Sequence, residues 1–405
     1  MLQKLRLGWN RIRTEATHFW SDDGPGGDCF WWLDAMLVLA GLRSKLSTRW
    51  IGAHIIQHLC NALFAFEVMV LVSQVWNGLD DTWDDVAEKV MGLLKITSPC
   101  LAIMKVLVMI HLRKPLAILR DFIFDRCVNS GDKTYDEVEQ EKLNQFGRTM
   151  FRAMFAFIAI EMILLSIPNR TMASMFQMPS WGASTFLYYF FVSTLPLGLL
   201  PRLWSHLSYI GILVMGMRMK LGMLVHRYRL MMNVSNLDLN QYFGDMNRNL
   251  REAVTQQLHF LRQFHILANA IGKAFLLIHY YSIFSIGTIM FMGKHMGINV
   301  FSAAFVVMSL ALLLEYYVWC YIVQSIKETA TSIGDLIYEI CALIPYNQNF
   351  HSEYVQLRTS LIIIWINNRN GYTVSCFGIL RLSILAFVNL LDVAYTVLMF
   401  LINMT

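Results

Sequence analysis

Acidic side chains stand inside otherwise apolar stretches of this sequence, where an isolated carboxylate is costly to bury. These residues are Asp34, Glu67, Glu161, Glu315 and Asp392. Carboxylates in such settings attract cations, or they pair with bases and hydroxyl groups on neighbouring helices. We expect the three glutamates to face the interior of a helical bundle and to pair there with bases such as Lys105 and Arg202.

One histidine pair has the spacing of a metal site. His54 and His58, in HIIQH, have the i, i+4 spacing of zinc ligands, but the glutamate of an HExxH motif is absent. The seven cysteines form no CxxC pair, and there is no GxSxG motif, no phosphate-binding loop and no GxGxxG that opens a helix after a strand. We therefore expect no metal, no cofactor and no enzymatic activity.

Membrane-spanning helices must carry these residues. Hydrophobic residues make up 56% of the sequence and charged residues 15%, whereas soluble domains carry about 25% charge. Seven segments are long and apolar enough to cross a bilayer, which takes roughly 20 helical residues. They are Ile51–Trp76, Val90–Leu112, Phe151–Ile167, Phe186–Val214, Ile271–Met292, Ile298–Val323 and Cys376–Ile402. The predicted fold class is all-α, a polytopic membrane protein with seven transmembrane helices.

Basic residues predict the orientation of these helices. The segments 1–49, 113–150, 214–273 and 327–374 hold 25 of the 33 Lys and Arg residues, and the connections on the other side hold only two. Under the positive-inside rule, the N-terminus is cytoplasmic and the C-terminus extracellular. The sequon at Asn169 then falls in an outer loop, where glycosylation can occur. The net charge of +5 is scattered along the chain, so nucleic acid is not an expected partner.

Helical periodicity continues on the cytoplasmic side. The stretch LNQYFGDMNRNLREAVTQQLHFLRQFHILANAI has one apolar face and is expected to run without a break into the fifth span. The stretch before the seventh span is expected to form two short helices broken near Pro345. Residues 215–270 and 327–374 would form an anchor layer, or they would lie flat on the bilayer. Residues 1–50 are expected to be cytoplasmic with an interfacial or re-entrant helix at 29–42, and the whole chain counts as a single domain.

The C-terminal third resembles a known family. The segment LRLSILAFVNLLDVAYTVLMFL is similar to the signature of insect odorant receptors. Its matching residues are Leu382, Ser383, Phe387, Ala394, Tyr395 and Thr396, the last in place of the usual serine. Upstream, EYYVWCYIVQSIKETATSIGDLIYEICAL resembles the sixth span and following inner helix of that family, with its cysteine at Cys320. The tryptophan that the family carries shortly after the position of Tyr338 is missing.

The resemblance implies a ligand-gated, non-selective cation channel in the plasma membrane of a sensory-neuron dendrite. It implies a heterotetramer with a shared co-receptor subunit, in which each seventh helix lines a central pore and a volatile organic molecule is the ligand. Insect gustatory receptors share the fold and remain an alternative, although no Gln follows Tyr395. A G-protein-coupled receptor is a further alternative that lacks the Asn-Pro-x-x-Tyr motif. A secondary transporter is another, because Pro196 and Pro201 are expected to break the fourth span.

By the resemblance, the last span carries the pore. Leu398 and Ile402 are expected to form a hydrophobic gate one turn beyond Tyr395, and Asp392 to favour cations. Packing is the alternative for the aliphatic pair, and pairing with a neighbouring helix is the alternative for Asp392.

The ligand pocket is expected in the outer halves of spans three, four and six, where aromatic and methionine side chains can build an adaptable apolar wall. The predicted lining residues are Met162, Leu165, Phe186, Tyr189, Phe190, Ser193, Phe301, Phe305, Met308 and Leu312. Packing within the bundle is the alternative for each of them. Glu161 could also line this pocket and favour polar or amine ligands.

Overall fold

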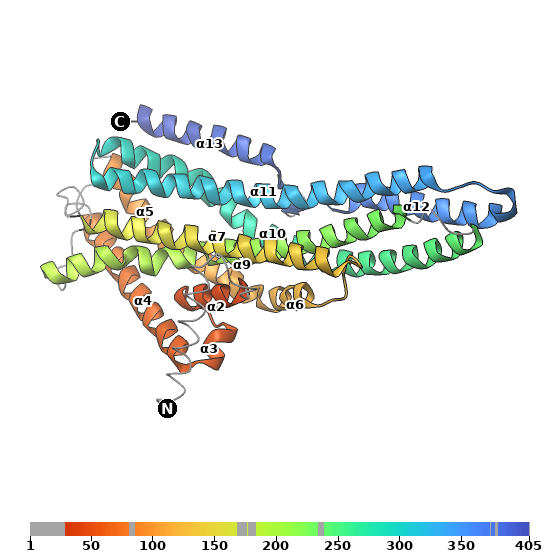
Figure 1. The fold of residues 1–405 in the computed structure, drawn as a ribbon. Coiled ribbons are helices and arrows are strands. Elements are labelled where there is room, and N and C mark those ends of the chain that lie inside the picture. Colours follow the sequence, from red (N-terminus) through yellow and green to blue (C-terminus); the bar gives the residue numbers. More distant parts are fainter. Residues whose placement is uncertain are drawn as a thin grey trace.

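The computed structural model describes residues 29–80, 86–167, 176, 184–233, 239–372, 374–376 and 380–404. These residues form an elongated bundle of α-helices (Figure 1). Seven of the described helices are long and apolar enough to cross a membrane. The predicted all-α class with seven candidate spans is therefore confirmed. The sequon at Asn169 lies outside the described residues.

The seven candidate spans differ greatly in length, and shorter elements connect them. The long helices are α4 (Ile51–Asp80), α5 (Val86–His111), α7 (Lys133–Ser166), α9 (Thr185–Leu230), α10 (Leu239–His295), α11 (Val300–Leu343) and α13 (Ile384–Asn403). The shorter helices are α2 (Cys29–Leu39), α3 (Lys45–Arg49), α6 (Arg113–Phe124) and α12 (His351–Gly371), with 3-10 turns η2 (Met231–Asn233) and η3 (Gln348–Phe350). Two short strands, β1 (Ser375–Cys376) and β2 (Leu380–Arg381), pair antiparallel.

The helices α9, α10 and α11 continue far beyond the length that a bilayer needs. The 57 residues of α10 include both the predicted amphipathic stretch and the fifth span, so the expected unbroken helix is confirmed. Together with α12, these helices form the narrow right-hand end in Figure 1. A buried hydrogen-bond chain joins α9, α10 and the C-cap of α12 there, because Tyr228 of α9 donates to Gln257 of α10 at 2.7 Å and Gln257 donates to Tyr372 at 3.2 Å.

The segment before the seventh span does not form two separate short helices as predicted. It contains the end of α11 and then α12, with a single break between them. The chain does break near Pro345, as predicted, but its first part is the end of α11, which runs without interruption to Leu343. The buried side chains Ile333, Ile337 and Ile340 continue the interior face of α11. The same face therefore packs on the bundle throughout, and the helix continues.

The fourth span is also unbroken, contrary to the expectation from its prolines. Helix α9 contains Pro196 and Pro201 in its interior. Its neighbours surround it: 78% of its most apolar window is buried. Tertiary packing of this extent outweighs the roughly 3 kcal/mol by which a proline disfavours a helix interior.

The last span begins eight residues later than predicted. Cys376 belongs to β1 and is buried, and Ser375 is paired with Arg381 across the hairpin. Helix α13 starts at Ile384, where the side chain of Ser383 accepts a hydrogen bond from the backbone N–H of Ala386. A serine N-cap therefore sets this boundary, and hydropathy alone does not.

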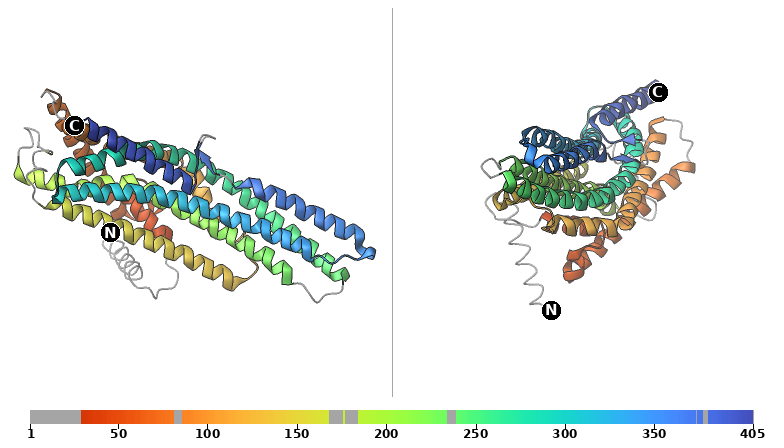
Figure 2. Two further views of the ribbon diagram at one scale, coloured as in Figure 1. Left: turned by 90° about the horizontal axis from the view of Figure 1, so that it is seen from above. Right: turned by 90° about the vertical axis from the view of Figure 1, so that its right-hand side faces the viewer.

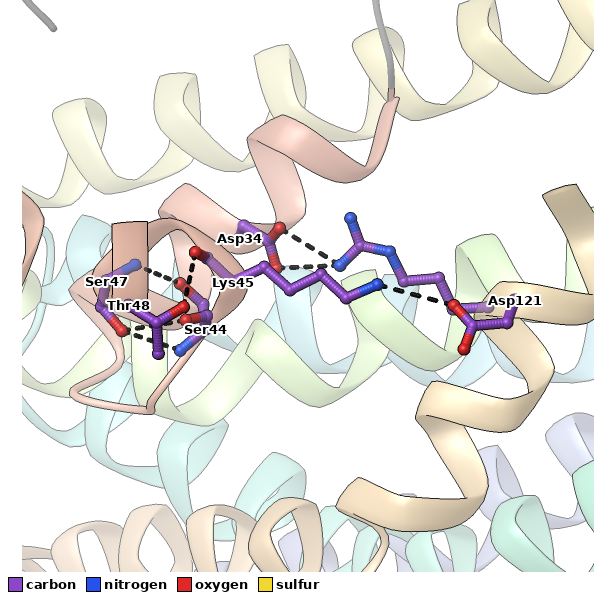
Figure 3. Close-up of polar contacts among 7 residues, drawn as sticks. Asp34, Ser44, Lys45, Ser47, Thr48 and Asp121 are labelled. Carbon is purple, nitrogen blue, oxygen red and sulfur yellow. Dashed lines mark hydrogen bonds and ion pairs between the residues drawn. The ribbon is translucent and has the colours of Figure 1, made fainter. Parts of the chain in front are cut away.

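Most of the segment at 29–42 folds as α2, which ends at Leu39 and packs on the bundle. Phe30, Leu33 and Met36 are almost fully buried, and Asp34 accepts two hydrogen bonds at 3.1 Å from Nη1 of Arg120 on α6. Figure 3 shows this buried pair beside the exposed pair Lys45–Asp121. An ion pair thus fastens this helix to α6, and its interfacial or re-entrant position stays a prediction.

Candidate functional site

A cavity of about 140 Å³ lies between the helices at the wide end of the bundle. Its wall is contributed by α4, α5, α7, α9, α10 and α11, together with Phe176. The lining residues are Leu71, Met91, Leu94, Lys95, Ser98, Glu161, Leu165, Phe176, Leu195, Pro196, Leu199, Leu200, Tyr281, Ile289, Phe301, Ala304, Phe305 and Met308. Only four of these residues carry a polar side chain. The volume is close to that of an engineered apolar cavity of about 150 Å³ that binds benzene.

Most of the pocket residues predicted on the sixth span line this cavity. Phe301, Phe305 and Met308 of α11 line it at the predicted helical spacing, with Ala304 between them. Leu312, one turn further along, is buried in the core and does not reach the cavity. On α7, Leu165 lines the cavity and Met162 does not, and Glu161 takes the neighbouring position on the wall.

The face expected on the fourth span points elsewhere. Phe186, Tyr189 and Phe190 are 75%, 41% and 42% exposed, and Ser193 lies at 3.2 Å from the hydroxyl of Ser166. Helix α9 contributes instead the set Leu195, Pro196, Leu199 and Leu200. The aromatic residues cluster at the end of α9, where Phe186 stacks on Phe190, because fewer neighbouring helices cover that end.

Several lining residues escaped sequence reasoning, above all those of α5. Met91, Leu94, Lys95 and Ser98 form one helical face on the cavity wall. Lys95 was the available signal, since an ionisable residue within an apolar span is a candidate functional position. Its ammonium group lies 5.3 Å from the centroid of the Phe176 ring.

Of the three glutamates expected to pair within the bundle, Glu315 does so, whereas both carboxylate oxygens of Glu67 and Oε1 of Glu161 have no hydrogen-bond partner among the described residues. Nζ of Lys105 is 3.0 Å from Oε1 of Glu315 and 2.9 Å from the carbonyl oxygen of Leu203. Nε2 of His206 is also 3.0 Å from that carboxylate oxygen. This cluster joins α5, α9 and α11, and its residues are at most 2% exposed. It is a structural crosslink of the core rather than part of the cavity wall.

Helix α13 carries the predicted pore residues on the flank of the bundle (Figures 1 and 2). Asp392 and Tyr395 are exposed, and Leu398 and Ile402 are half-buried against the core. Its buried residues are Ala386, Leu390 and Ala394. Within the described part of the chain, no hydrogen bond or ion pair reaches the carboxylate of Asp392; Thr396 donates to its backbone carbonyl instead.

Helix α10 separates the cavity from α13. Tyr281 and Ile289 of α10 line the cavity, and Gly287 lies on the roughly opposite face of the helix. A Cβ atom at Gly287 would stand 2.8 Å from Cγ1 of Val397 and 3.0 Å from the carbonyl oxygen of Ala394, so α13 approaches α10 closely there. Small residues permit such contacts between membrane helices. One helix thus contacts both the cavity and the predicted pore helix.

These features define a seven-helix membrane protein with a ligand-sized cavity between its helices. A family model described as 7tm odorant receptor matches residues 86–395. The chain belongs to the odorant receptor family, as the resemblance of its C-terminal third indicated.

Solved structures agree on the fold. The insect olfactory receptor OR5 from Machilis hrabei is similar with a TM-score of 0.68 at 10% sequence identity, over 93% of this chain and 98% of that one. The same receptor in complex with eugenol gives a TM-score of 0.68 at 10% identity, over 93% and 97% of the two chains. A search of curated proteins finds no match to this chain.

Proposed function

We propose that this odorant receptor is a subunit of a ligand-gated, non-selective cation channel that opens when a small volatile molecule fills the cavity. The observation that carries the proposal is the apolar cavity of about 140 Å³, whose volume suits a ligand about the size of benzene. A relative of the same fold is known in complex with eugenol, which supports an odorant as the ligand.

The exposed helix α13 supports a conducting role. A carboxylate that faces hydrocarbon is costly, so Asp392 requires water or a partner outside the chain. A central pore between subunits would supply that water, with Tyr395, Leu398 and Ile402 on the neighbouring face of α13. Aliphatic side chains can close such a path by excluding water, and polar groups wet it when it is open.

The contact between α10 and α13 suggests how the two sites communicate. A ligand shifts an equilibrium only through its different affinities for the two states. A molecule that fits better when α10 has moved outward would favour that position of α10. Because Gly287 brings α13 into direct contact with the opposite face, α13 would follow and the Leu398–Ile402 constriction would widen.

The assembly we propose is a heterotetramer with a co-receptor subunit in the plasma membrane of a sensory-neuron dendrite. The N-terminus would be cytoplasmic, in accordance with the excess of Lys and Arg in the four inner segments. The long ends of α9, α10 and α11, with α12, would then form a cytoplasmic anchor that holds subunits together while the outer ends of α13 separate.

Current recording tests this proposal. Cells that express the chain with an insect odorant co-receptor should give odorant-evoked cation currents that persist when G proteins are blocked. Cells that express the co-receptor alone serve as the control. Substrate uptake without current, or responses only to non-volatile tastants without a co-receptor, would contradict it.

A further inference from the structure

One polar group in the cavity wall has an unsatisfied hydrogen-bonding atom. Glu161 is 5% exposed, and its Oε1 has no hydrogen-bond partner among the described residues. It ends the buried face of α7 that runs through Phe151, Met154 and Ile158, so its side chain points into the bundle. The cavity lies there, with Glu161 on its wall.

The other polar groups on the wall differ from Glu161. Lys95 lies against the Phe176 ring, and Ser98 and Tyr281 contribute hydroxyl groups. Elsewhere in the bundle, the carboxylates of Asp34 and Glu315 contact Arg120 and Lys105. A buried carboxyl group without a donor is costly, and a ligand that brings the donor removes this cost.

We infer that the cavity recognises small volatile amines, whose nitrogen hydrogen-bonds to the carboxyl group of Glu161 while their hydrocarbon part fills the apolar remainder. This inference rests on the proposed function and specifies its ligand class. An amine is complementary to Glu161 in either protonation state: an ammonium ion donates to a carboxylate, and a neutral amine accepts from a carboxylic acid. The hydrogen bond between an ammonium ion and a carboxylate is charge-assisted and is stronger than one between neutral groups.

Four molecules with one ring and different substituents separate the possible ligand classes. Toluene, benzyl alcohol, benzylamine and benzoic acid share an aromatic body that the cavity volume admits. In cells that express the chain with a co-receptor, benzylamine should evoke half-maximal current at a lower concentration than the other three. Glu161→Gln should raise that concentration for benzylamine about 10- to 100-fold, as expected for the loss of a charged hydrogen bond. It should change the toluene response much less, because toluene forms no hydrogen bond with the carboxyl group.

Glu67→Gln is the matched control. Glu67 is 1% exposed and both of its carboxylate oxygens lack hydrogen-bond partners among the described residues, but it packs against Gly198 and does not line the cavity. It should leave the benzylamine response as in the wild type. Glu161→Asp withdraws the carboxyl group by one methylene and should weaken the benzylamine response less than Glu161→Gln does. If the glutamine variant fails to reach the cell surface, the aspartate variant tests the inference.

The outcomes distinguish two kinds of failure. A benzylamine response that Glu161→Gln and Glu161→Asp leave unchanged overturns the amine assignment, as does a preference for benzoic acid that Lys95→Gln abolishes. If benzylamine fails while toluene or benzyl alcohol evokes current, the amine assignment is wrong and the proposed channel stands. If none of a broad odorant panel evokes current with the co-receptor present, the proposed function itself fails.

Discussion

Helices α9 and α13 are both apolar, yet they differ greatly in how much of their surface is buried within the bundle. The most apolar window of α13 has a mean hydropathy of 2.1 and is 17% buried, whereas that of α9 has a mean hydropathy of 1.4 and is 78% buried. The more apolar helix thus contributes less to the core. The apolarity of a helix in this chain therefore does not indicate how deeply the helix is buried within the subunit. It indicates that the helix has an apolar environment, which lipid or a further subunit can supply.

Their polar residues differ in the same way. Arg202 of α9 donates to the carbonyl oxygens of Gly198 and Cys60 and to the side chain of Asn61, and His206 lies beside Glu315. Asp392 of α13 is exposed, without such a partner in the described chain. Polar groups on α9 should therefore determine stability, and those on α13 should determine conduction.

Lys105→Met should have the largest effect. It removes the base that contacts Glu315 and the Leu203 carbonyl of α9, and an uncompensated buried charge costs about 3–5 kcal/mol. The thermal stability of the detergent-solubilised protein should fall sharply, whereas Lys89→Met, at an exposed position of the same helix, should not change it. The double variant Lys105→Met, Glu315→Met should recover part of the loss. Wild-type stability in Lys105→Met would show that the core cluster is not needed.

Arg120→Ala should have the next largest effect on stability. The variant removes the two hydrogen bonds that Arg120 donates to the buried Asp34, and hydrogen bonds to charged groups contribute about 1.5–3 kcal/mol. Lys45→Ala breaks the neighbouring pair in Figure 3, whose side chains are 56% and 72% exposed, and should cost at most about 1 kcal/mol. Equal losses of thermal stability in the two variants would contradict this distinction between buried and exposed pairs.

Leu398→Ser and Ile402→Ser should act on gating more than on folding. Removing a leucine-sized side chain from the apolar closure costs the closed state about 1.5–3 kcal/mol, or about 10- to 100-fold in the ratio of open to closed channels. The measurement is standing current without odorant. Phe400→Ser, at an exposed position on another face of α13, is the control. Full closure in both gate variants would remove these residues from the pore.

Asp392→Asn should have the smallest effect, confined to conduction. A unit charge acts on an ion 4 Å away with about 1 kcal/mol in water, so single-channel conductance should fall by no more than about fivefold. Surface abundance and thermal stability should remain unchanged. Asp335→Asn, which removes an exposed carboxylate on the narrow end of α11, should leave conductance at the wild-type value.

The sequence predicted the elements of the fold better than their faces and ends. Hydropathy located all seven spans, and helical periodicity located the continuous α10, because both signals repeat over many residues. The predicted start of the last span was wrong because the segment before α13 is apolar as well, and Cys376 in it is fully buried. The boundary depends on the Ser383 cap and on strand pairing, which a hydropathy average does not detect.

The cavity was predictable on one helix and not on another for a physical reason. Phe301, Phe305 and Met308 lie on a stretch of α11 where one face meets the interior, so their helical spacing places them on the cavity wall. Along most of α9, all faces meet other helices, so no apolar stripe marks the cavity side. The exposed aromatics of α9 have the composition of a pocket, but the ends of neighbouring helices determine which of them are covered.

Chemical modification of a cysteine at position 392 tests the central claim about α13 most directly. In cells that express Asp392→Cys with the co-receptor, a charged, membrane-impermeant thiol reagent applied from outside should change the odorant-evoked current, and faster while odorant is present. The wild-type chain is the control for its own free cysteines, among them Cys100 and Cys320. If modification of Asp392→Cys is verified by mass spectrometry and the current is unchanged, α13 does not line the conduction path.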